Sequence, residues 1–433
     1  MSTLTLVIVA VFVLGYLCIA LESLTKVNKA AIALLMCVIC WTIYMFNPSA
    51  EIGEILKFNL GETAETLFFL MGAMTIVEIV DSNGGFNFVR DMLKTRNKRT
   101  LLWRVALMTF FLSAILDNLT TSIVMIMVLR KLINDDKERL LYAALVVISA
   151  NSGGAFSPIG DVTTIMLWIK GMITTQGVIT EIFIPSLVSM VIPALIMQYM
   201  LKGEFDRSQN IEEGHVSVYT KHQRRTIFCF GVGGLVFVPI FRYLTDLPPY
   251  MGILLVLGVL WTTTEIFSRH LDEDDTMAKR VSDLLSRIDI TTIMFFLGIL
   301  MAVSCLAEIG VLTMLGKGLD VTFGGNHYLV TGIIGVLSSI VDNVPLVAGC
   351  MGMYPVAEVG DMAVDGVFWQ LLAYCAGVGG SMLIIGSAAG VVVMGLEKIT
   401  FGWYLKRITW IAFVGYLAGM ASYWLIRTFI FSV

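Results

Sequence analysis

The chain has 433 residues, of which 57% are hydrophobic and 14% are charged, and its formal net charge is −4. Soluble domains carry roughly 25% charged residues, so this composition excludes a water-soluble fold and indicates an all-α polytopic membrane protein surrounded by lipid. The net charge excludes a basic nucleic-acid-binding domain, and the seven scattered cysteines indicate no disulfide framework.

Eight segments of the chain are apolar enough to be membrane-crossing helices, each of which needs about 20 residues. The N-terminus has no basic region and no small-residue cleavage pattern, so we expect the first segment to be a retained span. The expected spans, in chain order, are 4–21, 30–46, 63–82, 180–201, 226–244, 250–268, 289–308 and 408–428.

A hairpin is predicted between the third and fourth spans. Residues 101–116 and 119–129 are apolar limbs on either side of Asp117-Asn118. The second limb is only about 16 Å long, and the hydrocarbon core is about 30 Å thick, so this limb does not cross the membrane. We therefore expect a re-entrant hairpin at about 101–132 whose tip lies near mid-membrane.

The second half of the chain repeats this arrangement. Residues 328–341 and 344–356 are apolar limbs around Asp342-Asn343. They predict a second re-entrant hairpin at about 328–356, again with an Asp-Asn pair at its tip.

Each hairpin is followed by a region that contains a Gly-Gly-x5-Gly run, at about 139–172 and 367–397. Both regions are long enough to cross the membrane, but glycine breaks a helix and frees backbone carbonyl and amide groups. Such groups persist at membrane depth only where they are buried in protein or line a cavity. We therefore expect two broken helices at mid-membrane.

Loop charge predicts the orientation of the chain. Both flanks of the first hairpin are rich in lysine and arginine, as are loops 202–225, 269–287 and 398–407, and basic loops are cytoplasmic. The second hairpin is followed by acidic residues without lysine or arginine, so its ends should be external. This count places the N- and C-termini outside the cell.

The motifs indicate an internal repeat. The Asp-Asn pairs are offset by 342 − 117 = 225 residues and the Gly-Gly pairs by 379 − 153 = 226. Each repeat holds five spans and one hairpin, and an odd number of spans inverts the second repeat. We expect a first repeat at 1–202, a cytoplasmic linker at 203–225 and a second repeat at 226–433.

Oxygen-bearing side chains gather at the hairpin tips and helix breaks, and hard cations such as Na⁺ take oxygen ligands. The candidate ion-binding residues are Asp117, Asn118, Thr120, Thr121, Asn151, Ser152, Ser157, Asp161, Thr163, Thr164, Asp342, Asn343, Ser381 and Ser387. Na⁺ is expected at the three aspartates of this set. Glu78 and Glu308, in the spans that lead to the hairpins, are candidates for a proton route. No cofactor is expected.

The three aspartates have an alternative interpretation as helix N-caps. A neutral serine or asparagine would cap without the cost of about 2.5–3.5 kcal/mol for a charge at mid-membrane, which favours an ion-binding role. The halves differ, because Ser387 stands where the first half has Asp161. We therefore expect the stronger cation site in the first half, with Asp161 beside Asp117, and Asp342 facing Ser387.

These motifs resemble the NhaD-type sodium/proton antiporters of the ion-transporter superfamily, which also holds dicarboxylate, citrate and arsenite carriers. The resemblance implies two inverted repeats, re-entrant hairpins, a homodimer and an elevator-like movement. It rests on Asp117-Asn118 with Thr120-Thr121-Ser122, on the run from Ser149 to Thr164, and on Asp342-Asn343-Val344-Pro345.

Residues and resemblance together predict a multi-pass protein of the cell (inner) membrane that exchanges Na⁺, and also Li⁺, for protons and serves pH homeostasis. Paired mid-membrane aspartates would bind cation and proton competitively. The alternative is a proton- or sodium-coupled carrier of an organic anion or arsenite in the same superfamily. An intramembrane enzyme is a third class, but neither a nucleophile–base pair nor a His-Glu-x-x-His motif occurs.

Overall fold

The computed structural model describes residues 3–20, 26–46, 52–86, 89, 92–201, 203–205, 219–268, 281–340 and 342–429. Regular structure in these ranges is helical, and seven helices are long and apolar enough to cross a membrane. They are α4 (Ile52–Ser82), α6 (Lys98–Leu116), α10 (Thr175–Gln198), α11 (Lys221–Thr245), α12 (Pro249–Ser268), α14 (Ile290–Glu308) and α21 (Thr409–Phe429). The predicted all-helical membrane fold is confirmed.

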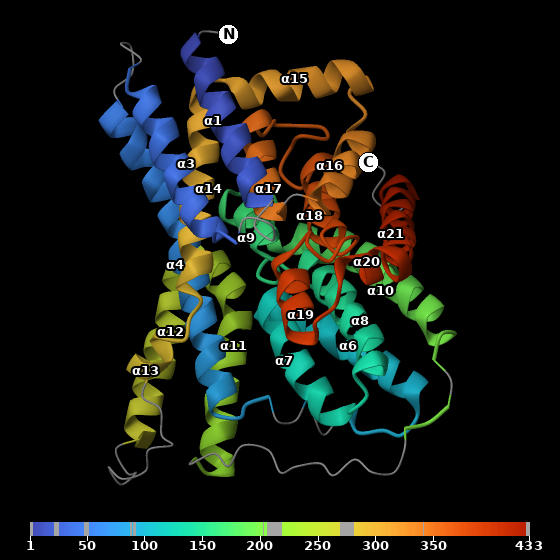
Figure 1. The fold of residues 1–433 in the computed structure, drawn as a ribbon. Helices are drawn as coiled ribbons and strands as arrows, with labels where there is room; N and C mark the ends of the chain where they lie inside the picture. The colour runs from blue at the N-terminus through green and yellow to red at the C-terminus, as the bar shows by residue number, and fades with distance from the viewer. Residues whose placement is uncertain are drawn as a thin grey trace.

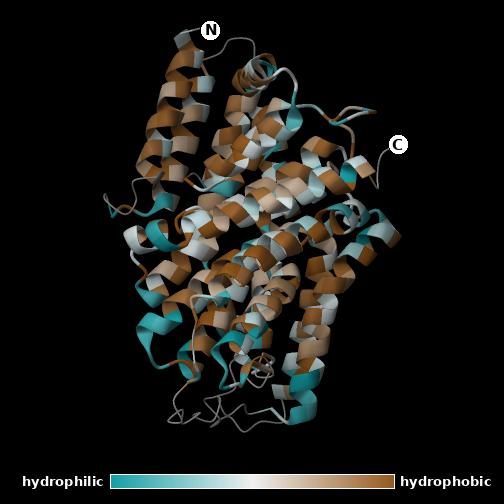
Figure 2. Cartoon of the chain, turned by 90° about the vertical axis from the view of Figure 1, so that its right-hand side faces the viewer, coloured by the Kyte–Doolittle hydropathy of each residue, from teal (hydrophilic) through white to brown (hydrophobic). Residues whose placement is uncertain are grey.

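Figure 2 shows hydrophobic residues along most of the helices, with hydrophilic residues concentrated toward the lower end of the view. Further helices complete the described part of the fold. They are α1 (Thr3–Ala20), α3 (Lys29–Tyr44), α7 (Asn118–Leu132), α8 (Asp136–Ala155), α9 (Val162–Ile169), α13 (Val281–Leu285), α15 (Val311–Phe323), α16 (His327–Ser338), α17 (Asn343–Met353), α18 (Val367–Gly379), α19 (Ala388–Glu397) and α20 (Phe401–Arg407).

The helices form two groups that lie side by side (Figure 1). We call α1, α3, α4, α11, α12 and α14 the panel, in which α3 packs on α14 and α4 packs on α12. We call α6 to α10 and α16 to α21 the core, in which α6 packs on α8, α16 on α18 and α10 on α21. Each group therefore draws helices from both halves of the sequence.

The two halves pair their helices in the same way. In the panel, α1 packs on α3 as α11 packs on α12; in the core, α6 packs on α8 as α16 packs on α18. The bases of the two hairpins, α6–α7 and α16–α17, lie at opposite ends of the molecule (Figure 1). Both observations support the predicted inverted repeat, which stays a prediction.

Glycine allows the close packing of hairpin against broken helix. A Cβ atom on Gly153 would lie 2.1 Å from the carbonyl oxygen of Phe110, and one on Gly379 would lie 2.2 Å from that of Gly335. These contacts are equivalent at offsets of 379 − 153 = 226 and 335 − 110 = 225. The Gly-Gly runs therefore bring two helices together, in addition to weakening the helix that contains them.

Several predicted boundaries are wrong. Helix α4 begins eleven residues before the predicted residue 63, because polar helix-forming residues extend it beyond the apolar segment. Helix α6 begins at Lys98, capped by Asn97, and so is long enough to cross, unlike the predicted limb. The predicted loop 398–407 contains α20, capped by Thr400, and α11 takes the last residues of the predicted linker.

Two expectations fall partly outside the described residues. Within the predicted loop 269–287, residues 269–280 are not described, and the remainder contains α13. Within the predicted linker 203–225, residues 206–218 are not described. Helix α15 was not predicted at all; it lies across one end of the molecule and ahead of the second hairpin (Figure 1).

Candidate ion-binding site

Asp117 is the single residue between α6 and α7, and its backbone is strained. Its φ of 75° and ψ of 161° fall in a region that is essentially restricted to glycine and costs of order 1–3 kcal/mol for other residues. Its carboxylate accepts hydrogen bonds from the Thr120 amide at 2.8 Å and the Thr120 hydroxyl at 2.9 Å. Asp117 is therefore an N-cap held in a conformation that capping alone does not require.

Asp342 occupies the same place before α17 but has different partners. One carboxylate oxygen, Oδ1, accepts a hydrogen bond from the Val344 amide at 3.2 Å. The other, Oδ2, lies 3.2 Å from the ammonium group of Lys29, the first residue of α3. The tip of the second hairpin is therefore joined to the panel by an ion pair.

Asp161 lies between the two hairpin tips and is only 1% exposed. It caps α9 by accepting bonds from the Thr163 amide at 2.9 Å and hydroxyl at 2.7 Å. The Asn118 amide donates to its Oδ2 at 2.6 Å, and the Asn343 amide lies 3.5 Å from its Oδ1. The side chains that meet at this buried acid thus come from both halves of the chain.

Asn151 extends this polar cluster across the helix breaks. Its side-chain oxygen accepts a bond from Asn118 at 3.0 Å, and its amide donates to the Ser387 hydroxyl at 3.0 Å. Ser387 in turn caps α19 by accepting from the Gly390 amide. We call Asn118, Asn151, Asp161, Thr163, Asn343 and Ser387 the Asp161 cluster; each member is at most 5% exposed.

The hydrogen bonds around Asp161 involve amides, and the expected pairing of the acids stays a prediction. The hairpin side chains that reach Asp161 are Asn118 and Asn343 rather than the neighbouring aspartates, and Ser387 bonds to Asn151. In the described residues, no three groups among His, Cys, Asp and Glu come together as a metal site, so the three aspartates do not form one cluster.

The other predicted residues lie around or away from the cluster. Ser157 donates to the Ala114 carbonyl at 2.5 Å, and Ser381, just after α18, donates back to the Val378 carbonyl at 2.6 Å. Ser152 accepts a bond from the Ser189 hydroxyl at 2.9 Å. Among the predicted site residues, Thr121 and Thr164 have buried hydroxyl groups without a hydrogen-bond partner.

The predicted proton-route residues lie outside this cluster. Glu78 is half-buried and lies 3.7 Å from Arg287, and Glu308 is exposed and accepts a bond from Asn59 at 3.1 Å. Both belong to the panel. Neither contacts a member of the Asp161 cluster among the hydrogen bonds and ion pairs of the described residues.

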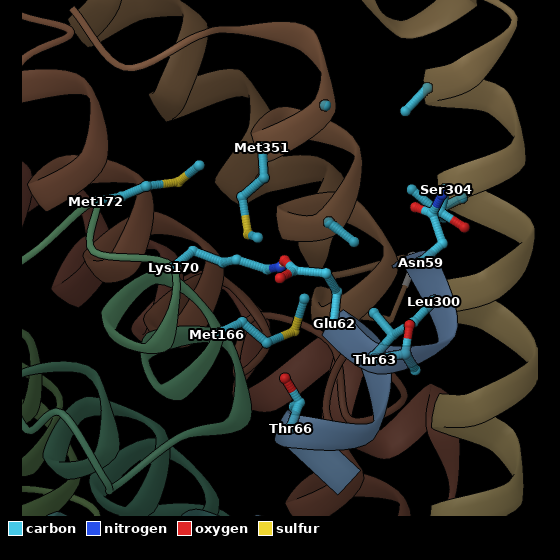
Figure 3. Close-up of a pocket in the computed structure, with 14 residues that line it drawn as sticks. Asn59, Glu62, Thr63, Thr66, Met166, Lys170, Met172, Leu300, Ser304 and Met351 are labelled. Carbon is cyan, nitrogen blue, oxygen red and sulfur yellow. The ribbon is translucent and has the colours of Figure 1, made fainter. Parts of the chain in front are cut away.

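A cavity of about 300 Å³ lies beside the cluster, between α4 and α14 of the panel and α9 and α17 of the core. Polar side chains from α4 line one wall, and Met166 and Met351 line the other (Figure 3). Lys170, at the end of the helix that Asp161 begins, forms an ion pair with Glu62 across it. The cavity therefore separates panel from core, and Met166, five residues after the buried acid, lines it.

Sequence reasoning missed Lys29 and Lys170, two lysines that join core to panel. Each stands at an end of an apolar helix, where lysine commonly marks only the membrane interface. A usable signal existed for Lys29: a positive charge in the first turn of a helix is unfavourable, so a lysine there needs a negative partner.

Comparison with known proteins places the chain in a family. Residues 16–373 match the model described as citrate transporter. The chain is 47% identical over 425 residues to "Sodium/proton antiporter 1" of Arabidopsis thaliana, covering 98% of this chain and 72% of the relative. It is 30% identical over 456 residues to the Na(+)/H(+) antiporter NhaD of Alkalimonas amylolytica, covering 97% and 90%.

A solved structure shares the fold at low sequence identity. The YdaH transporter of Alcanivorax borkumensis aligns with a TM-score of 0.59 and 11% identity, covering 93% of this chain and 99% of that one. At this identity the likeness concerns the fold alone. The sequence matches carry the assignment: the chain belongs to the family of NhaD-type sodium/proton antiporters, which are membrane transporters.

Proposed function

We propose that the protein exchanges Na⁺ for H⁺ across the membrane and that Asp161 is the central group of the exchange. The observation that carries this proposal is a buried carboxylate contacted by amides from both hairpin tips. The names of the relatives, sodium/proton antiporter and Na(+)/H(+) antiporter, support the same pair of ions.

Competition at one carboxylate explains the coupling. A buried charge is costly unless it is compensated, so Asp161 favours a bound proton or a bound cation over an uncompensated anion. A proton removes the charge that attracts Na⁺, and bound Na⁺ disfavours protonation. Each ion therefore displaces the other, and a site that carries one ion at a time exchanges them.

The surrounding asparagines can contact Asp161 both when it is free of Na⁺ and when Na⁺ is bound. Asn118 and Asn343 present amide NH₂ groups to the carboxylate. Rotating an amide by about 180° replaces its NH₂ donor with its carbonyl oxygen, which is a ligand for a hard cation. Asn151, Thr163 and Ser387 supply further oxygen atoms within the cluster. In this proposal Asp117 and Asp342 bind cations on the paths to Asp161.

We extend the proposal to four finer points: Li⁺ is transported in place of Na⁺, two copies form a homodimer, the protein resides in the cell (inner) membrane, and both termini are external. Li⁺ is a hard cation that takes the same oxygen ligands. The termini follow from the basic loops of the sequence.

An organic-anion carrier is the rival, since the matching family model is described as citrate transporter. A citrate carboxylate in the Asp161 cluster would meet a like charge in a low-dielectric site. Lys29 does not offer an anion an uncompensated positive charge, because Asp342 lies beside it. We therefore favour the cation.

The test is transport by purified protein in proteoliposomes loaded with a pH-sensitive dye. Adding Na⁺ or Li⁺ should move protons in the opposite direction, whereas citrate and arsenite should not. Citrate or arsenite uptake without Na⁺-evoked proton movement would contradict the proposal. Liposomes without protein correct for leak.

A further inference from the structure

The two hairpin aspartates satisfy their second carboxylate oxygen in different ways. At the first tip, the Oδ2 atom of Asp117 accepts from the Thr120 hydroxyl. The equivalent position of the second half, 120 + 225 = 345, is Pro345, which has neither a hydroxyl nor a backbone N–H. There, the Oδ2 atom of Asp342 is paired with the Lys29 ammonium group instead.

The position of Lys29 in its helix is unfavourable for a positive charge. Lys29 is the first residue of α3, where the partial positive charge of the helix end disfavours a cation. The Asp342 carboxylate at 3.2 Å and the ring of Phe295, whose centroid lies 4.3 Å from the ammonium nitrogen, both compensate for this. The Lys29 and Asp342 side chains are 25% and 17% exposed, so water screens the pair only in part.

The ion pair joins the panel to the core at the tip of the second hairpin. Lys29 belongs to the panel, and Asp342 belongs to the core. Helix α12 of the second half is the equivalent of α3 in the first half. The sequence of α12 contains no lysine or arginine. The first tip therefore has no equivalent cation from α12.

We propose that Lys29 is a tethered cation that competes with Na⁺ for the Asp342 carboxylate. This inference rests on the proposed exchange of Na⁺ for H⁺ and adds a residue that sets the affinity for Na⁺. When Na⁺ is absent, the ammonium group neutralises the carboxylate. When Na⁺ arrives, it replaces the ammonium at Oδ2, and the lysine stem withdraws while its charge keeps the Phe295 ring as a partner.

The test compares three variants of the full-length protein with the wild type. Lys29→Met removes the competing charge and keeps the length of the stem, Lys29→Arg keeps a charge, and Lys57→Met removes an exposed lysine that pairs with Glu54. Na⁺-dependent exchange and Na⁺-induced thermal stabilisation are measured at alkaline pH, where proton competition is least.

Lys29→Met should lower the apparent KM for Na⁺, and the Na⁺ concentration that half-stabilises the protein, by about threefold to tenfold. Lys29→Arg should leave both values unchanged or raise them, and Lys57→Met should change neither. If Lys29 were only a structural tie, Lys29→Met would lower thermal stability without lowering either Na⁺ value, and that result would overturn the inference. Absence of Na⁺-dependent exchange in the wild type would instead reject the proposed function.

Discussion

At the scale of single residues, sequence predicted which side chains lie at the tips and breaks but not how they pair. The offsets of 225 and 226, which differ by one residue, match positions along the chain, and they identified Asn118, Asn343, Asp161 and Ser387. They carry no information on contacts between the halves. The convergence of both asparagines on Asp161 depends on how two hairpins pack, which only the fold determines.

The role of Asp161 can be separated from helix capping by a matched pair of substitutions. Asparagine caps a helix about as well as aspartate but carries no charge. Asp161→Asn should therefore reduce Na⁺-dependent proton movement by more than about tenfold, equivalent to about 1.4 kcal/mol, while leaving the protein folded. The readout is the initial exchange rate in proteoliposomes.

Asp135→Asn is the control for that experiment, since Asp135 caps α8 from an exposed position with the same kind of bonds. It should retain wild-type exchange. Equal rates for Asp161→Asn and Asp135→Asn would show that the buried charge is dispensable, and Asp161 would then be a cap and nothing more.

At the scale of helices, hydropathy located the long apolar spans and glycine located both breaks. Hydropathy did not predict helices, or parts of helices, that are short or polar. Helices α15 and α20 lack the length of a span, and the first residues of α4 contain charges that a hydropathy window rejects. Capping residues such as Asn97 and Thr400 are the local signals that would have set these boundaries better.

The ends of the broken helices are fastened to the other half of the chain. Glu397, at the end of α19, accepts bonds from Arg130 at 2.7 Å and Arg139 at 2.6 Å, near the base of the first hairpin. At the opposite end, Asp365, just before α18, accepts bonds from the Thr174 amide and hydroxyl, just after α9. Residues of the first half therefore bind the end of the second broken helix, and Asp365 of the second half binds the segment that follows the first broken helix.

Removing the charge of Glu397 should loosen this contact. The side chain of Glu397 is 1% exposed and that of Arg139 is 10% exposed, so Glu397→Gln leaves a largely buried guanidinium group with less compensation. We expect a loss of roughly 3 kcal/mol in stability, seen as a lower midpoint of thermal unfolding in detergent.

Glu54→Gln serves as the comparison, because Glu54 and Lys57 form an exposed pair of the kind that contributes about 0–1 kcal/mol. It should leave the unfolding midpoint almost unchanged. An unfolding midpoint for Glu397→Gln that matched that of Glu54→Gln would show that the two arginines find other partners.

At the scale of the whole molecule, composition alone indicated a polytopic membrane protein, and the odd number of spans indicated inverted halves. The division into panel and core was not predictable from hydropathy, since strongly apolar helices such as α14 and α16 occur in both groups. Among the described residues, two ion pairs join the groups, Lys29–Asp342 and Lys170–Glu62, and the cavity of about 300 Å³ lies between the groups at the second. Movement of the core against the panel would have to separate both pairs.

The central claim is that Na⁺ and a proton compete for Asp161, and it is tested most directly by adding Na⁺ to purified protein in weakly buffered detergent solution. The account predicts that Na⁺ releases protons from the wild type and that Asp161→Asn, which has no carboxyl proton to lose, releases markedly fewer. Na⁺ binding to the wild type without proton release, or undiminished release from Asp161→Asn, would contradict it.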